Sequence, residues 1–167
     1  MKLNLGSGEK YRVGYVNIDK RRIIGSVESD ITEDVCLLDY PPNSIDEIYI
    51  SQLLEHFNLQ NIQRLLRRFH TWLKPHSLLL VSIPNMKTIG RLLADGHSDS
   101  ILFNWIYGAQ DGADGMTHAW GFTEETITEE LNNAGFEVIG EFEGEDDDSG
   151  FTFEGVPLSL NLVCEKI

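Results

Sequence analysis

An amphipathic helix followed by a continuous apolar strand is the feature that most constrains the fold of this chain. Between residues 59 and 73 the apolar side chains recur at intervals of three and four, the pattern of a helix with one buried face. They are Ile62, Leu65, Leu66, Phe69, Trp72 and Leu73. Pro75 is expected to close this helix, and the apolar run over residues 78–83 is typical of a central parallel strand. Because parallel strands need long crossover connections, this helix and the strand after it together predict an α/β fold.

Short strands and helices alternate along the rest of the chain. We expect strands over residues 2–6, 15–18, 45–50, 136–143 and 159–166, and a third strand near residues 30–33. Helical segments are expected between residues 86 and 107 and again after Thr123, which can cap a helix. The two closing strands lie close in sequence, which indicates one antiparallel strand near the edge. The sequence predicts a single three-layered domain over residues 1–167 with a mostly parallel sheet.

The first connections between strands are unusually short. Six residues separate Gly8 from Tyr15, whereas a helical crossover takes about ten to twelve. The interval over residues 20–30 has room for one or two helical turns. We therefore expect the first crossover helices to be reduced.

Glycines and carboxylates follow successive strands at the edge where open α/β sheets bind ligands. Gly6 and Gly8 come directly after the first strand, where the missing side chains let a ligand approach the backbone. Asp19 ends the second strand and can accept two hydrogen bonds from a ribose diol, and Asp34 can accept from an adenine amino group. Taken alone, the two glycines are as consistent with an ordinary turn as with a ligand site. Each carboxylate alone is more often solvated than bound to a ligand. Their order predicts a nucleoside pocket.

The same segments carry a resemblance to a known family. They are Leu-Asn-Leu-Gly-Ser-Gly at residues 3–8, residues 15–19, 44–49, 54–57, 72–75 and 83–85, and Asn-Ala-Gly-Phe at 133–136. With these motifs the chain resembles the class I S-adenosylmethionine-dependent methyltransferases, particularly a small type-11-like group. The resemblance spans nearly the whole chain and implies a Rossmann-like fold, S-adenosylmethionine as cofactor and methyl transfer as activity.

The resemblance also implies roles for individual residues. Asn4, Gly6, Ser7 and Gly8 would surround the methionine portion of the cofactor, and Asp19 would bind its ribose. Asp34 and Val35 would meet the adenine ring. Ser51 to Leu53, with Ser51 and Leu53 as the contacting residues, would lie beside the sulfonium and the substrate entrance.

The chain departs from its relatives at three points. Asn4 stands where many relatives carry an acid, Lys10 stands in place of a third glycine, and the interval from Gly6 to Asp19 is short. Asn4 can donate and accept hydrogen bonds but brings no charge to the cofactor's ammonium group. Tyr11 replaces the last glycine of a Gly-x-Gly-x-x-Gly motif, which argues against nicotinamide or flavin dinucleotides.

Two histidines are candidates for catalysis. His56 follows the strand over residues 45–50, and His118 lies in a loop rich in glycine and aromatic residues. Methyl transfer depends mainly on alignment, but a histidine can remove the proton of a hydroxyl acceptor. The alternative for His56 is a packing or helix-capping role. Tyr107, Gln110 and Trp120 could line the substrate entrance or, equally, pack beneath a long loop.

Charge and composition limit the partners. The net charge of −14 disfavours nucleic acids. No apolar stretch has the length of a signal or membrane span, so we expect a cytoplasmic protein. No group of potential ligands has convincing metal-binding spacing, so we expect no metal. The leading hypothesis is methylation of a small molecule or a glycan, with a homodimer as an expected assembly, and the alternative is a noncatalytic cofactor-binding or assembly module.

Overall fold

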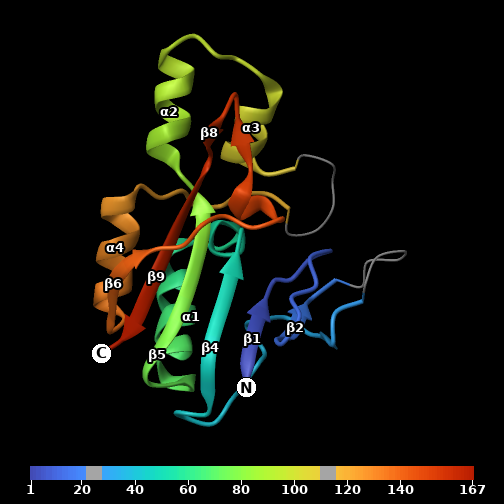
Figure 1. Ribbon diagram of the computed structural model, residues 1–167, viewed down its shortest axis with the longest axis vertical. Helices are drawn as coiled ribbons and strands as arrows, with labels where there is room; N and C mark the ends of the chain where they lie inside the picture. The colour runs from blue at the N-terminus through green and yellow to red at the C-terminus, as the bar shows by residue number, and fades with distance from the viewer. Residues whose placement is uncertain (22–27, 110–115) are drawn as a thin grey trace.

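A seven-stranded sheet forms the centre of the computed structural model, which describes residues 1–21, 28–109 and 116–167 (Figure 1). The strand order is β3-β2-β1-β4-β5-β9-β6. In that order the strands are Ile31–Thr32, Val16–Asp19, Lys2–Leu5, Ile45–Ser51, Leu73–Pro84, Ser159–Lys166 and Phe136–Glu141. The pairs from β3 to β5 are parallel, and β9 runs antiparallel to both β5 and β6. The expected mostly parallel sheet with one antiparallel strand near its edge is confirmed.

Helices α1 (Leu59–Trp72) and α4 (Glu124–Asn133) cover one face of the sheet. The side chains of Gln63 and Glu130 join the two helices through a hydrogen bond of 3.0 Å. Leu3, Leu5 and the apolar stripe of α1 belong to one buried cluster. The stripe read from the sequence is therefore the core-facing side of α1.

The boundary between α1 and β5 differs from the expectation. The helix ends at Trp72, and Leu73 already has extended backbone angles. Pro75 lies inside β5, three residues beyond the helix end, so it does not itself close the helix. Buried Leu73 is the first residue of the strand and pairs with Ile45.

The opposite face of the sheet has no α-helix among the described residues, only the short 3-10 helix η2 (Asp148–Gly150). The chain passes from β1 to β2 through residues 6–15 without a helical turn, which confirms the reduced first crossover. Asn4, Asn17 and Tyr49 are register partners on the three neighbouring strands and share a side of the sheet. The third layer expected from the sequence is irregular chain here: residues 6–15 and the segment after β6.

A second, smaller apolar cluster lies beyond the carboxyl end of β5. It joins α2 (Met86–Ala94), α3 (Ser100–Tyr107) and a short hairpin of β7 (Thr152–Phe153) and β8 (Val156–Pro157) (Figure 1). Its buried members are Ile89, Leu92, Leu102 and Leu158. The two helices match the interrupted helical region expected over residues 86–107, while the hairpin was not predicted. Within the described part of the chain, no helix is long and apolar enough to cross a membrane.

Candidate functional site

The loop after β1 turns sharply at Gly6. Gly6 has φ +70°, and a Cβ built on it would lie 2.8 Å from Cδ1 of Leu53. The N–H groups of Gly6 and Ser7 both donate to the carbonyl oxygen of Ile18, at 2.8 and 3.0 Å. The turn therefore brings the backbone of the β1 loop against the residues that follow β4.

Asp19 at the end of β2 anchors this loop from the other side. Its carboxylate is buried and accepts the N–H of Gly8 at 2.9 Å and that of Arg21 at 2.8 Å. The Arg21 guanidinium lies 3.5 Å from the same carboxylate. A carboxylate has about four acceptor positions, so capacity remains for a bound diol.

Asn4 supports the loop through its side-chain amide. Nδ2 of this buried residue donates to Oδ1 of Asn17 at 2.8 Å and to the carbonyl oxygen of Lys10 at 3.2 Å. The backbone N–H of Arg12 also donates to Oδ1 of Asn17, at 2.8 Å. The amide that replaces the acid of many relatives thus holds the chain that replaces the first crossover helix.

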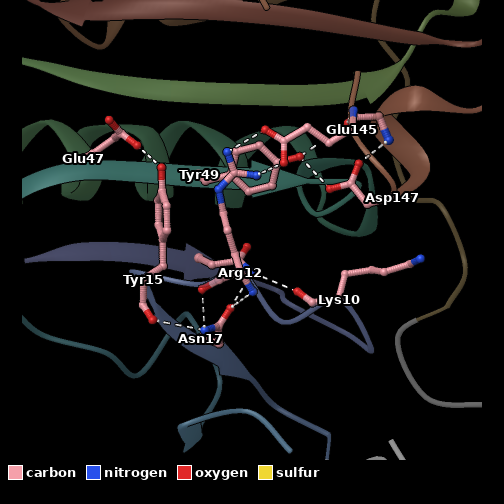
Figure 2. Close-up of polar contacts among 10 residues, drawn as sticks. Lys10, Arg12, Tyr15, Asn17, Glu47, Tyr49, Glu145 and Asp147 are labelled. Atoms are coloured by element: carbon pink, nitrogen blue, oxygen red, sulfur yellow. Dashed lines mark hydrogen bonds and ion pairs between the residues drawn. The ribbon is translucent and has the colours of Figure 1, made fainter. Parts of the chain in front are cut away.

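Arg12 lies over the face of the sheet that carries Asn17 and Tyr49 (Figure 2). Its guanidinium lies over the ring of Tyr49, 4.0 Å from the centroid, and 4.8 Å from the centroid of Tyr15. Both of its terminal nitrogens donate to the carboxylate of Glu145, one at 2.7 Å. The hydroxyl of Tyr49 donates to Asp147 at 2.6 Å. These contacts fasten the segment after β6 across β1 and β4.

A cavity of about 560 Å³ opens at the carboxyl ends of β1, β2 and β4. Its walls include every residue expected to contact the cofactor: Asn4, Gly6, Ser7, Gly8, Asp19, Asp34, Val35, Ser51 and Leu53. Among the described residues, six carboxylates line it against three basic side chains, so this part of the lining is acidic. The carboxylate of Asp34 also accepts the N–H of Cys36 at 2.8 Å.

A second group of side chains borders the cavity at η1 (Leu54–His56). The rings of His56 and His118 meet edge to face with centroids 4.9 Å apart, and both residues line the cavity. Burial lowers the pKa of His118 to about 4, and it also lowers the pKa of His56. Burial raises the pKa of the adjacent Glu55, which is 1% exposed, to about 8. Because their pKa values are lowered, the imidazoles of His56 and His118 are both neutral near pH 7.

The sequence model of the methyltransferase domain family matches residues 12–141, well over half of the 167 residues. The chain belongs to this family of methyltransferase domains.

Solved methyltransferases share the fold of this methyltransferase at low sequence identity. A Burkholderia thailandensis 1,6-didemethyltoxoflavin-N1-methyltransferase, solved with 1,6-didemethyltoxoflavin and S-adenosylhomocysteine, is 17% identical, with a TM-score of 0.63 over 99% of this chain and 70% of that one. An S-adenosylmethionine-dependent methyltransferase from Archaeoglobus fulgidus is 16% identical, with a TM-score of 0.65 over 99% and 85%. One from Mesorhizobium loti is 20% identical, with a TM-score of 0.61 over 98% and 90%. No curated protein matches the chain significantly.

The aromatic residues expected at the substrate entrance of this methyltransferase are not part of the cavity wall. Tyr107 and Trp120 are exposed and do not line the cavity, so their contact with an acceptor stays a prediction. Gln110 lies outside the described residues. Trp105, whose carbonyl oxygen lies 3.1 Å from Nδ1 of His118, lines the cavity instead.

Sequence reasoning missed the contribution of the acidic segment after β6. Asp147 and Asp148 line the cavity, although the run over residues 145–148 has the pattern of a solvated loop. Burial raises the pKa of Asp148, and the neighbouring Asp147 raises it further. Contacts with residues far away in the sequence, among them Arg12, Tyr49 and Ser159, bring this segment to the site, and no local pattern encodes them.

Proposed function

We propose that this methyltransferase transfers the methyl group of S-adenosylmethionine to a small-molecule acceptor. The observation that carries the proposal is the convergence of nine predicted residues, drawn from four separate stretches of the chain, on one cavity. Its volume falls within the range of small-molecule sites in proteins.

The lining suits a cationic cofactor without phosphates. The sulfonium carries a positive charge, which the excess of carboxylates in the cavity wall favours. Gly6 and Gly8 leave the backbone open to the methionine portion, and Asp19 offers acceptors to the ribose hydroxyls. When bound, S-adenosylmethionine would supply an electrophilic methyl group, and transfer would leave a neutral thioether and release the acceptor's proton. Holding the methyl group and the acceptor in line supplies much of the rate.

A small acceptor agrees with the charge of the protein. With its net charge of −14 the molecule repels polyanions, and the Burkholderia thailandensis methyltransferase of similar fold was solved with 1,6-didemethyltoxoflavin bound. The glycan acceptor, the homodimer and the cytoplasmic location expected from the sequence stay predictions. So do the catalytic roles of His56 and His118.

Calorimetric titration with S-adenosylmethionine and with S-adenosylhomocysteine tests the proposal. Asp19→Asn keeps the shape of the side chain and removes its charge, so we expect binding at least about tenfold weaker, the loss typical of a hydrogen bond to a charged group. Asp39→Asn is the matched control, because Asp39 is exposed and lies outside the cavity.

Saturable binding that Asp19→Asn weakens and Asp39→Asn leaves unchanged supports the proposed cofactor site and justifies a screen of small-molecule acceptors. If the wild-type protein binds neither ligand, the proposed methyl transfer is wrong, and the noncatalytic alternative takes its place. Equal binding by both variants would remove Asp19 from the cofactor site.

A further inference from the structure

Three side chains that could bind a metal ion lie close together near the carboxyl end of β4. Glu55 and His56 are consecutive residues of η1, and His118 comes from a loop more than sixty residues later. The carbonyl oxygen of Glu55 accepts the N–H groups of Ala119 and Trp120, at 2.7 and 3.1 Å, which fixes that loop beside η1. One ligand atom of each of the three side chains lies within 4.8 Å of the others.

The carboxylate of Glu55 is the unusual member of this group. Glu55 is 1% exposed, and neither of its side-chain oxygens has a hydrogen-bond partner among the described residues. Burying a polar group without a hydrogen-bond partner is energetically costly. Buried carboxylates are therefore normally paired, protonated or bound to a metal.

Among the described residues, each of the two histidine rings makes its hydrogen bond through Nδ1. Nδ1 of His56 lies 3.2 Å from the carbonyl oxygen of Thr117, and Nδ1 of His118 lies 3.1 Å from that of Trp105. A carbonyl oxygen only accepts, so each Nδ1 carries the hydrogen and each Nε2 carries the lone pair. Histidines that bind metals are usually oriented in this way, with the other ring N–H donated to a carbonyl or carboxylate.

We propose that Glu55, His56 and His118 bind a divalent first-row transition-metal ion, such as Zn²⁺, Mn²⁺ or Fe²⁺. Two imidazoles with one carboxylate form a set that such ions accept, whereas Mg²⁺ and Ca²⁺ prefer oxygen ligands throughout. Ligands bonded at about 2.0–2.2 Å to one ion lie roughly 3–3.5 Å apart, so the three side chains need to close by about 1 Å. Side-chain rotation supplies such a movement.

The surroundings distinguish this group from surface histidine–carboxylate pairs. His76 and Glu165 also meet, at 2.7 Å, but the side chain of His76 is 80% exposed. Glu55 is buried, and the carboxylate of Asp148 adds negative charge close enough to affect it. A cation between Glu55 and the two histidines satisfies the unpartnered oxygens and offsets that charge.

The proposed ion would lie next to the cavity, because two of its ligands line the cavity wall. Three protein ligands leave coordination positions for water or for an oxygen of a bound molecule. A contact with the methyl acceptor is a consequence that rests on the proposed methyl transfer. The metal site itself does not depend on that activity.

Spectroscopic titration with Co²⁺ tests the proposal on protein that carries no histidine tag and has been freed of metal with a chelator. We expect one equivalent to bind and to give visible d–d bands without the sulfur charge-transfer band of thiolate ligands. Glu55→Gln and His118→Ala should each weaken binding at least tenfold. His76→Ala, the matched control from the exposed pair, should bind as the wild type does.

A second measurement on the wild type alone covers the case in which either variant fails to fold. Substoichiometric Mn²⁺ should broaden the ring signals of His56 and His118 before those of the other three histidines in nuclear magnetic resonance spectra. No Co²⁺ binding by the wild type, binding that survives both substitutions, or earlier broadening of another histidine would overturn the metal site. The same samples titrated with S-adenosylmethionine report the cofactor site separately, through its dependence on Asp19.

Discussion

Gly6 occupies a tight backbone position in the cavity wall. Its φ of +70° lies in the left-handed region, and its missing Cβ leaves room for Leu53 at 2.8 Å. Both properties place the β1 loop against the chain that follows β4, where two parts of the predicted pocket meet. A side chain at this position disturbs the conformation and the contact at once.

We expect Gly6→Ala to lower the free energy of unfolding by about 2–4 kcal/mol, since a strained φ costs roughly 1–3 kcal/mol and the contact with Leu53 adds to it. Urea denaturation followed by circular dichroism measures the change. Gly14→Ala is the matched control, because Gly14 has φ +87° but nothing within 4 Å of its built Cβ. Adding Leu53→Ala to Gly6→Ala should recover the contact part of the loss, and no recovery would contradict the steric explanation.

At the scale of elements, irregular chain replaces a helical layer on one face of the sheet. Residues 6–15 and the segment after β6 have few apolar side chains to bury there, so polar and aromatic contacts hold them. Arg12 is the centre of these contacts, because its guanidinium meets two aromatic rings and a carboxylate (Figure 2). The packing of this face thus depends in part on the geometry of this arginine.

We expect Arg12→Ala to lower the free energy of unfolding by about 1–3 kcal/mol, mostly through lost ring contacts, because half-exposed Glu145 adds little. Arg12→Lys should lose most of the same amount, since an ammonium lacks the planar fork that stacks and bridges. Chemical denaturation measures both variants beside Arg64→Ala, an exposed arginine of α1 that should change stability by less than about 0.5 kcal/mol. If Arg12→Lys were as stable as the wild type, the positive charge alone, and not the planar guanidinium, would account for the stabilisation.

At the scale of the whole molecule, the charge balance is the dominant electrostatic property. The chain has 27 acidic residues against 13 basic ones, and the ion pairs with an exposed partner, such as Lys87 with Glu125, contribute little. Self-repulsion of the remaining negative charge destabilises the compact state. Salt screens this repulsion over a distance of about 10 Å at 0.1 M.

Raising sodium chloride from 10 mM to 500 mM should therefore increase the Tm by a few degrees, which corresponds to about 1 kcal/mol for a domain of this size. Scanning calorimetry at pH 7 measures the shift. Sodium chloride is preferred to sulfate, because sulfate strengthens apolar burial in any protein. A fall in Tm over the same range would mean that the ion pairs outweigh the net repulsion.

The sequence by itself determined the elements whose signals are local. The stripe over residues 59–73, the apolar run of β5 and the cap at Thr123 each depend on neighbours along the chain, and each became the expected element. The order of Gly6, Asp19 and Asp34 after successive strands also indicated which residues meet, because parallel strands bring their carboxyl ends to one edge.

Only the tertiary structure decided the contacts between distant segments. Arg12 with Glu145 and Glu55 with His118 are 133 and 63 positions apart, and no periodicity or spacing links such residues. The same reason explains why neither the proposed metal site nor the place of Asp147 in the cavity wall is predicted by the sequence. Local propensity acts through adjacent residues, whereas a site assembled from loops depends on how the completed sheet places them.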